Sequence, residues 1–337
     1  MKNLLLSFLT AIISSLVSLV LIEILIRVMT ATPAATWSDR PAFYFRDPAN
    51  PSMQNYSYEP VKPANKFRIA VIGDSFSFAP YMQFTDTFSA KLEGMLKLNK
   101  TERKAEVINY GVPAYSTSHE IGTTKRALSE GADLVLLQIT LNDPEIKAHR
   151  PSGITENMND PFAVYTSPKG ILGKWKTYNF VMQKLHNNRA HAAYKQYFVD
   201  LYENPKTYAA FEGSMTELIE TVKKENKPIV AVVFPLFGIA MDNSYPFYPI
   251  HEKVDALLTK LGVTHMDISS IYKGIPLERL QVVPGGDRHP NEIAHRMAAE
   301  KIYLWLEELK LIPEEFLIQE KFATRLGVNP QRKQTKK

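Results

Sequence analysis

A serine, a glycine, an asparagine and a histidine stand out in this sequence because each lies in a short block of small and polar residues. Ser75 follows the apolar run FRIAVI in the block GDSFS, Gly111 lies in NYGVPAYST, Asn142 in TLNDPE and His289 in GGDRHPNEIAH. These residue types are the ones that acyl transfer needs. A serine hydroxyl attacks an ester when a base takes its proton, and histidine has the ordinary pKa nearest neutrality.

Acyl transfer also needs hydrogen-bond donors aimed at the oxyanion that develops during the attack. The backbone N–H groups of Ser75 and Gly111 and the side-chain amide of Asn142 are three candidates. Glycine suits this position because a backbone N–H can be offered closely only where no Cβ intrudes. A carboxylate would hold the tautomer of His289, the candidate base, and stabilise its imidazolium.

Each of these polar residues also has a purely structural interpretation. A serine after a strand is more often a helix cap, so the block around Ser75 alone leaves that alternative open. Asp74 is expected to cap the next helix or orient its loop, and Asp143 to form the turn before Pro144. His295 is expected to be a packed or hydrogen-bonded helix residue.

The strands that precede these blocks must lie in parallel if the blocks are to meet. From Phe67 onward, apolar runs of strand length alternate with amphipathic stretches of helix length, which predicts a parallel sheet covered on both faces. Adjacent parallel strands bring their carboxyl ends to one edge, so the first three blocks should face one crevice. The predicted strands are 67–72, 105–110, 133–140, 228–234 and 263–268, and the predicted helices are 86–98, 118–130, 206–225, 250–261 and 291–310.

In this order, the four blocks resemble those of a known family. GDSFS, NYGVPAYSTSHE, LNDPE and DRHPNEIAHRMAAE are similar to the serine, glycine, asparagine and histidine blocks of the SGNH hydrolases, also called GDSL esterases and lipases. The resemblance covers most of residues 67–310. It implies a three-layer α/β/α sandwich with a central parallel sheet, flavodoxin-like, with Ser75 as nucleophile and His289 as base. Gly111, Asn142 and the Ser75 amide would form the oxyanion hole.

The chain departs from the family pattern at two positions. The usual acid stands three residues before the catalytic histidine, where this chain has Gly286, and the nearest acid is Asp287, two residues before His289. A related branch of membrane-linked polysaccharide acetyltransferases has an Asp at that place, so the resemblance assigns the triad acid to Asp287. The second departure is Ala114, where the glycine block often has another Gly.

The N-terminal residues 1–30 predict a transmembrane anchor. Leu4 to Ile22 carry no charge, and a helix needs roughly 20 apolar residues to cross a bilayer core. This run is longer than the apolar core of a typical signal peptide, and the candidate cleavage sites in TATPAAT surround Pro33. An uncleaved anchor is therefore favoured over a cleaved signal.

The rest of the chain divides into three predicted parts. Repeated prolines make residues 31–66 an extended linker, and residues 67–312 form the SGNH hydrolase-like domain. The interval at about 144–205 is too long for a strand-to-helix connection and is expected to be an inserted cap. Residues 313–337 form a basic tail. Its first part, from Pro313, is expected to pack on the domain, and for Lys321 to Lys337 a solvated terminus is favoured over a binding site.

Composition limits the possible ligands. The net charge of +5 comes from basic residues spread along the chain, and no aromatic-basic motif is present, so no nucleic-acid partner is expected. The histidines show no zinc-binding spacing, so no metal is assigned, and no cofactor is expected. The absence of cysteine fits an exported domain and a cytosolic one equally.

Three functions remain open from the sequence. The first is a serine esterase that hydrolyses an acyl ester, O-acetyl above all, of an envelope glycan or lipid. The resemblance to membrane-linked envelope members implies a single-pass protein of the bacterial inner membrane, with its catalytic domain in the periplasm or outside the cell. The second is an O-acyltransferase that passes the acyl group to a polysaccharide hydroxyl with a multi-span membrane partner. The third, a non-catalytic glycan-binding scaffold, is disfavoured because Ser75, Gly111, Asn142 and His289 are all present.

Overall fold

The computed structural model describes residues 2–29, 53–146, 165–284 and 287–318. The chain forms two compact units. One consists of Met1–Ala35 with Arg150–Tyr197, and the other of Thr36–His149 with Phe198–Lys337. The second unit contains the whole sheet and all four polar blocks.

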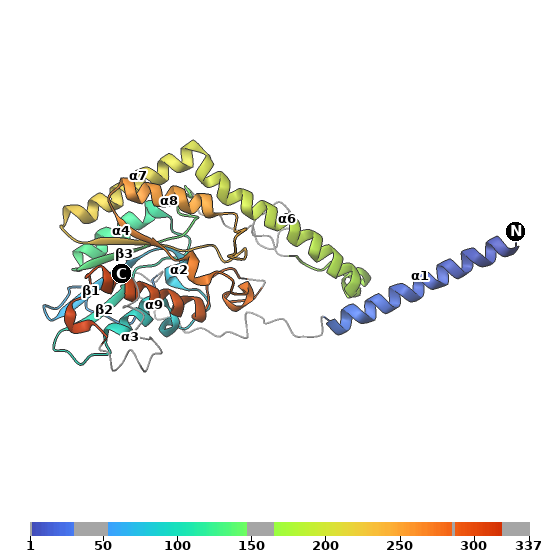
Figure 1. Ribbon diagram of the computed structural model, residues 1–337, viewed down its shortest axis with the longest axis horizontal. Helices are drawn as coiled ribbons and strands as arrows, with labels where there is room; N and C mark the ends of the chain where they lie inside the picture. The colour runs from blue at the N-terminus through green and yellow to red at the C-terminus, as the bar shows by residue number, and fades with distance from the viewer. Residues whose placement is uncertain (1, 30–52, 147–164, 285–286, 319–337) are drawn as a thin grey trace, which may run out of the picture. The chain divides into compact units, whose positions relative to one another are not determined.

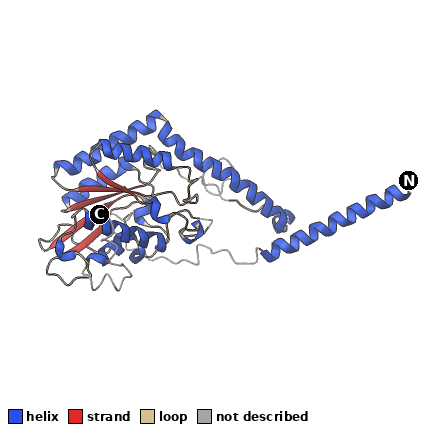
Figure 2. Cartoon of the chain, in the orientation of Figure 1, coloured by secondary structure: helices blue, strands red, loops and turns tan. Residues whose placement is uncertain are grey.

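A five-stranded parallel sheet forms the centre of the second unit (Figure 2). Its order is β2-β1-β3-β4-β5, and every neighbouring pair is parallel. The three inner strands β1, β3 and β4 are buried almost throughout, as expected for strands covered on both faces. The strands are β1 (Lys66–Ile72), β2 (Lys104–Asn109), β3 (Leu134–Ile139), β4 (Ile229–Val233) and β5 (Thr264–Asp267), each within one residue of its predicted ends.

Helices cover both faces of the sheet (Figure 1). On one face α3 (Phe88–Leu96) packs against α9 (Glu292–Glu308). On the other face lie α4 (Thr117–Ser129), α7 (Pro205–Lys224) and α8 (Tyr248–Lys260), with α4 and α7 in contact. This arrangement confirms the predicted three-layer α/β/α sandwich. The short helices are α2 (Ser75–Phe78) and the 3-10 turns η2 (Phe84–Asp86), η3 (Ser269–Tyr272), η4 (Leu277–Arg279) and η5 (Glu314–Phe316).

Arg68 anchors the amino end of β1 from inside the protein. Its side chain is fully buried, and its Nε donates to Glu106 Oε1 over 2.6 Å. The Nη atoms donate to the carbonyl oxygens of Glu59, Pro60 and Glu130. The guanidinium therefore joins the first two strands to the chain segment that precedes β1.

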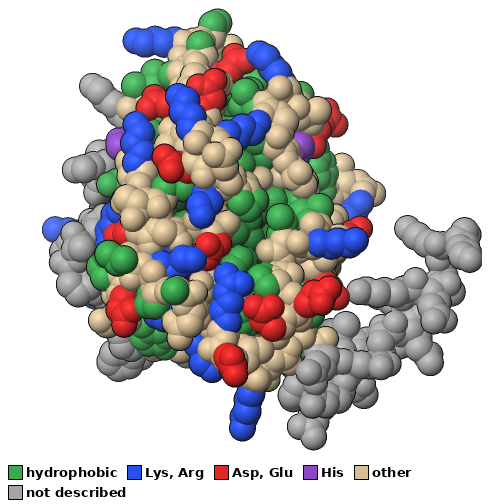
Figure 3. All heavy atoms as spheres, turned by 90° about the vertical axis from the view of Figure 1, so that its left-hand side faces the viewer, with side chains coloured by type: hydrophobic (Ala, Val, Ile, Leu, Met, Phe, Trp, Pro, Cys, Tyr) green, Lys and Arg blue, Asp and Glu red, His purple; other side chains and the backbone are tan. Residues whose placement is uncertain are grey.

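Surface charge on the second unit is mixed in sign. Over the face seen in Figure 3, Lys and Arg side chains are interspersed with Asp and Glu. Exposed ion pairs of this kind contribute little stability individually.

The predicted linker is described only from residue 53 onward. Asn55 exchanges two hydrogen bonds with Asn109 at the end of β2, over 2.7 and 2.8 Å, and Gln54 donates to Phe78 O. This part of residues 31–66 therefore lies against the domain, while residues 31–52 fall outside the described residues. Of the predicted tail, Phe316 is buried against Phe67, and residues 319–337 also fall outside the description.

The first unit contains three helices in the part that is described: α1 (Lys2–Met29), α5 (Ile171–Lys174) and α6 (Lys176–Glu203), whose last residues belong to the second unit. Leu5–Met29 in α1 has a mean hydropathy of 2.5 and is long enough to cross a membrane. That length and composition are compatible with a membrane anchor or a signal sequence. The predicted cap at 144–205 corresponds in part to α5 and α6, whereas residues 147–164 lie outside the described residues.

Candidate active site

Ser75, His289 and Asp287 form a hydrogen-bonded chain. His289 Nε2 lies 2.9 Å from Ser75 Oγ, and His289 Nδ1 lies 2.7 Å from Asp287 Oδ1. An ionised carboxylate only accepts hydrogen bonds, so Nδ1 carries a proton and Nε2 is left to accept the serine proton. The His289 side chain is 27% exposed, so a substrate can reach it. This is the arrangement required of a nucleophile, its base and an orienting acid.

A local turn explains how an acid only two residues before the histidine reaches its ring. Asp287 Oδ1 accepts the backbone N–H of His289 over 2.8 Å, and the same oxygen accepts from Nδ1. This Asx-type turn folds the Asp287 side chain back over the next two residues. The spacing of Asp287 is therefore compatible with the geometry of a triad.

Charges within this group shift both pKa values. Burial alone would lower the pKa of His289, but the Asp287 carboxylate and its hydrogen bond outweigh burial and raise it. Burial alone would raise the pKa of Asp287, but the charge of His289 and its two hydrogen bonds lower it. The pair is thus polarised toward carboxylate and imidazolium, which favours proton uptake by His289.

The turn that carries Ser75 is fixed by buried polar groups. Asp74 caps α2, as predicted, by accepting from Phe76 N over 2.9 Å. Gln138 Oε1 at the end of β3 accepts from Ser77 Oγ over 2.8 Å and from Asp74 N over 3.3 Å. The helix ends at Ala79 in the left-handed conformation, with φ of 59°. Ser75 is therefore held at the start of a single rigid turn.

Of the three candidate oxyanion donors, the Gly111 N–H already has an acceptor. It donates to Asn109 Oδ1 over 3.0 Å. A Cβ at Gly111 would stand 2.7 Å from Phe78 N and 2.9 Å from Asp74 O, so this glycine is required by the close approach of α2. Gly111 thus lies against the turn that carries Ser75. Its N–H can bind an oxyanion only if Asn109 Oδ1 shares or releases that N–H.

The other two candidates are differently placed. Ser75 is the first residue of α2, so its N–H has no acceptor inside that helix. Asn142 follows β3 and is partly exposed, and its Oδ1 atom has no hydrogen-bond partner among the described residues.

Three acidic side chains are buried behind the turn that carries Ser75. Glu120 on α4 and Asp143 after β3 are buried beside Asp74, and within the described ranges neither oxygen of Glu120 has a hydrogen-bond partner. Burial, with the Asp74 charge added, raises the pKa of Glu120 well above its ordinary value. Burial, with the charges of Glu120 and Asp74, does the same for Asp143. Asp143 thus joins a buried acidic cluster in addition to forming the turn expected of it.

The segment that carries His289 contacts α2 on one side and leads into the capped start of α9 on the other. Phe76 of α2 packs edge-on against the His289 ring, with centroids 5.5 Å apart. Asn291 caps α9 by accepting from Ile293 N and Ala294 N. His295 is fully buried, and its Nδ1 accepts from Phe88 N over 3.1 Å. Burial lowers its pKa to about 3, so the expectation of a packed helix histidine is confirmed.

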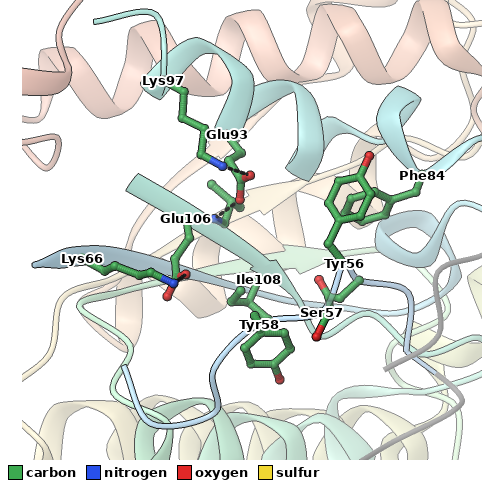
Figure 4. A pocket seen from close by; sticks show the side chains of 11 residues that line it. Tyr56, Ser57, Tyr58, Lys66, Phe84, Glu93, Lys97, Glu106 and Ile108 are labelled. Carbon is green, nitrogen blue, oxygen red and sulfur yellow. Dashed lines mark hydrogen bonds and ion pairs between the residues drawn. The ribbon is translucent and has the colours of Figure 1, made fainter. Parts of the chain in front are cut away.

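A separate pocket lies at the β2 edge of the sheet (Figure 4). It has a volume of about 200 Å³, and Tyr56, Tyr58 and Phe84 contribute to its wall. The ion pair of Lys66 with Glu106 also lines it, at 2.9 Å. Ser75 and His289 are not among the residues that line this pocket. Across the described part of the chain, no three His, Cys, Asp or Glu side chains form a group that could hold a metal ion.

Sequence reasoning missed the residues that position the turn that carries Ser75. Gln138 and Thr140 are polar residues in the otherwise apolar run LVLLQIT, and Asn109 ends a strand. Polar side chains inside a strand predicted to be buried are the signal that could have identified them. Glu120 has no comparable signal, because acidic residues are common near the start of a helix.

A search of solved structures finds similar chains of low sequence identity. A protein described as lipolytic and of the G-D-S-L family, from Desulfitobacterium hafniense, aligns with 70% of this chain and 98% of its own at 12% identity, with a TM-score of 0.42. An acetylxylan esterase from Geobacillus stearothermophilus aligns with 75% and 95% at 13% identity, also with a TM-score of 0.42. The psychrotrophic esterase EstA from Pseudoalteromonas sp. aligns with 72% and 97% at 12% identity and the same TM-score.

The two sequence comparisons give a different result. Neither a scan against protein-family models nor a search of curated proteins finds a match. The assignment therefore depends on features of the chain itself, which are the sheet order, the order of the motif blocks and the hydrogen-bonded Ser75, His289 and Asp287. The chain forms a three-layer α/β/α sandwich, and its ordered motif blocks resemble those of the SGNH hydrolases.

Proposed function

We propose that this protein is a serine esterase of the SGNH type that hydrolyses an acyl ester through a Ser75 acyl-enzyme. The observation that supports it best is the hydrogen-bonded chain from Ser75 Oγ through His289 to Asp287, with lengths of 2.9 and 2.7 Å. The two distances are within the range required of a nucleophile and its base.

Acylation follows from these contacts. Ser75 Oγ attacks the ester carbonyl carbon while its proton passes to His289 Nε2, and the carbonyl electron pair moves to the oxygen. The Asp287 carboxylate stabilises the imidazolium that forms. The imidazolium then gives its proton to the departing alkoxide as the carbon–oxygen bond breaks. Ser75 is left acylated, and the alcohol leaves.

Deacylation repeats the same steps with water. His289 takes a proton from the water as its oxygen attacks the acyl carbon, and then returns a proton to Ser75 Oγ as the acid departs. In both steps the proposed oxyanion donors are the Ser75 N–H, the Asn142 amide and the Gly111 N–H. The Gly111 N–H requires the Asn109 side chain to share or release it, because Asn109 Oδ1 accepts it at 3.0 Å. Losing one such donor typically costs about 10²- to 10³-fold in rate.

The proposed substrate is an O-acetyl ester of an envelope glycan or lipid. The support is the resemblance of the motif blocks to membrane-linked envelope members, together with the apolar α1. In this proposal α1 is a single-pass anchor in the bacterial inner membrane, and the catalytic unit lies in the periplasm or outside the cell.

The first test is hydrolysis of p-nitrophenyl acetate by the full-length chain in detergent. Ser75→Ala and His289→Ala should each lower kcat by about 10⁴- to 10⁶-fold, because each removes a member of a unit that acts together. Ser129→Ala, at an exposed position of α4, is the matched control and should leave the rate unchanged. A fluorophosphonate probe should label Ser75, as located by mass spectrometry. Labelling at another residue, or hydrolysis retained in Ser75→Ala, would refute the assignment.

An O-acyltransferase is the second candidate, and the position of Asp287 favours it. An acid two residues before the histidine resembles a branch of membrane-linked polysaccharide acetyltransferases, and here that acid is hydrogen-bonded to His289. Such an enzyme would form the same acyl-enzyme and pass it to a sugar hydroxyl, with a multi-span membrane partner as the acyl source. Adding a polysaccharide acceptor to acetylated enzyme separates the two, since a transferase yields acetylated polysaccharide and an esterase yields acetate.

A further inference from the structure

The start of α6 is tied to the end of α1 by a carboxylate. Glu23 on α1 accepts from Lys176 N over 2.9 Å, Thr177 N over 2.7 Å and Thr177 Oγ1 over 2.6 Å. The first N–H groups of a helix have no partner inside it, so Glu23 supplies the cap that α6 would otherwise lack. Arg27 completes the contact by donating to Lys174 O over 2.9 Å and pairing with Glu23 over 2.7 Å.

These bonds fix the depth of α5 relative to a membrane. The uncharged run from Leu4 to Ile22 ends immediately before Glu23. At 1.5 Å per residue, such a run is about as long as the hydrocarbon core is thick, so Glu23 and Arg27 stand at the headgroup level. Residues bonded to them stand there too. This step depends on the proposed anchoring role of α1.

The side chains at that level are apolar and exposed. Ile171 is 84% exposed, Leu172 42% and Trp175 40%, and on the first turns of α6 Phe180 and Val181 are 46% and 49% exposed. Trp175 stacks on Tyr178 with ring centroids 6.2 Å apart. Such a group of large apolar side chains is unusual on a water-exposed surface. Trp and Tyr are enriched where a membrane meets water.

The charged side chains of residues 161–199 are all basic. From residue 161 to residue 199 the sequence has no acidic residue. The same stretch carries Lys169, Lys174, Lys176 and Lys184, all with exposed side chains. Lysines beside apolar side chains suit anionic phospholipids, because the ammonium groups reach the phosphates while the stems lie along the apolar surface.

We propose that residues 169–185, which we name the interface segment, bind the surface of an anionic phospholipid bilayer next to the point where α1 leaves it. Glu23 and Arg27 hold this segment at the headgroups, its apolar side chains enter the boundary of the acyl chains, and its lysines contact lipid phosphates. The chain would then contact the membrane through a second element besides its anchor.

Nitroxide labels provide the test, since the chain has no cysteine and single cysteines can be introduced without competition. The full-length protein is placed in nanodiscs of phosphatidylglycerol and phosphatidylcholine, with labels at Leu172→Cys and Phe180→Cys. Leu16→Cys in α1 is the lipid reference, and Leu304→Cys on α9, where the leucine is 43% exposed, is the aqueous reference. Both interface labels should be accessible to oxygen and shielded from a water-soluble nickel chelate, at a depth between the two references.

The other outcomes are distinct. Interface labels as accessible to nickel as Leu304→Cys, with Leu16→Cys in lipid, would overturn the proposal and leave the anchor standing. Shielding of the interface labels from both oxygen and the nickel chelate would overturn the proposal in favour of a protein partner. Dipolar broadening between labels would identify that partner as a second copy of the chain. If Leu16→Cys itself lies in water, the anchor fails together with the proposal. None of these readings depends on esterase activity.

The charge contribution has its own test. Exchanging phosphatidylglycerol for phosphatidylcholine should move the Phe180 label toward water. Lys174→Gln should weaken interfacial occupancy by about 5-fold, as expected for one lysine near an anionic surface. Lys224→Gln on α7, in the other unit, is the matched control and should change nothing. Depths that are insensitive to both lipid charge and Lys174 would overturn the assignment to anionic lipid.

Discussion

The two ends of β1 bury charged side chains in opposite ways. At the amino end, Arg68 is fully buried and its guanidinium donates to Glu106 and to three carbonyl oxygens. Just past the carboxyl end Asp74 is equally buried, and its Oδ2 atom has no partner in the described part of the chain. The same holds for both oxygens of Glu120.

This difference suggests that the amino end of β1 stabilises the fold and that its carboxyl end carries the proposed site. A buried charge with all its hydrogen bonds made is stable where it stands, whereas a buried carboxyl without partners costs stability or stays protonated. Perturbed carboxyl groups gather at functional sites, and here they lie directly behind Ser75. We therefore expect mutations at the carboxyl end to change activity and those at the amino end to change stability.

The largest expected effect is at the carboxyl end. Asp287→Asn should lower kcat/KM by about 10⁴-fold with little loss of stability, because the imidazolium of His289 loses its orienting charge. In the wild type Asp287 raises the pKa of His289 above the ordinary 6.5, and the base must be neutral to act. The acidic limb of the pH–rate profile should therefore lie above pH 6.5 and move to lower pH in the variant. An acidic limb that stays at the same pH in Asp287→Asn would show that Asp287 does not raise the pKa of His289.

The next effect tests the amino end. Arg68→Met should lower the free energy of unfolding by about 3–5 kcal/mol, because Glu106 keeps only Lys66 as its partner and three carbonyl oxygens lose their donor. The kcat of the protein that remains folded should not change. Urea unfolding measures the first quantity and ester hydrolysis the second.

A surface arginine provides the control for this variant. Arg103→Met breaks an exposed ion pair with Glu315 and should cost less than about 1 kcal/mol. Adding Glu106→Gln to Arg68→Met should recover part of the loss. Equal losses at Arg68 and Arg103 would remove the contrast between a satisfied buried charge and a surface one.

Glu120→Gln should have a smaller, pH-dependent effect on stability. The folded pKa of Glu120 is raised above its ordinary value of 4.5. Its contribution to stability is therefore complete below pH 4.5 and is lost as the pH rises through the folded pKa. Glutamine cannot ionise, so the variant should gain on the wild type as the pH rises, by about 1–3 kcal/mol.

Urea unfolding at several pH values measures that gain. Glu217→Gln, at a side chain 57% exposed, should show no such trend. A difference between Glu120→Gln and wild type that shrinks with rising pH would mean that Glu120 is ionised in the folded protein.

The smallest effect concerns the backbone of the glycine block. Ala114 has φ of 64°, a conformation that costs a residue with a side chain about 1 kcal/mol or more. Ala114→Gly should therefore raise the midpoint of thermal unfolding slightly, while the rate of hydrolysis stays the same. Ala210→Gly, within α7, should instead lower the midpoint, because glycine costs about 1 kcal/mol in a helix interior. A loss of stability in both variants would mean that Ala114 is not strained.

The sheet was predictable because its signal is local. Apolar runs such as FRIAVI and DLVLLQIT are long enough to be buried strands, and the alternation with helices specifies parallel pairing. The first three blocks could be placed together for the same reason, since the carboxyl ends of parallel strands share an edge, whereas the resemblance to a family placed the histidine block with them. The resemblance to a family supplied Asp287, which no spacing argument identified.

The unpredicted features depend on packing between distant residues. The acceptor for the Gly111 N–H is Asn109, and a sequence pattern does not show which way that side chain turns. Glu120 is buried only because α4 is covered on its inner face, and its pKa depends on that burial. The contact of Glu23 with Thr177 joins residues 154 positions apart and leaves no periodic signal.

The distance along the chain between Ser75 and His289 would delay the proposed activity during synthesis. The two residues are 214 positions apart, and the strands β2 and β3 that flank β1 both follow it in the chain. At about 5–20 residues per second, His289 leaves the ribosome on the order of ten seconds or more after Ser75. A nascent or truncated chain that ends before residue 289 therefore carries the serine without its proposed base. The proposed esterase would therefore stay inactive until the last strand and the His289 segment that follows it have been made.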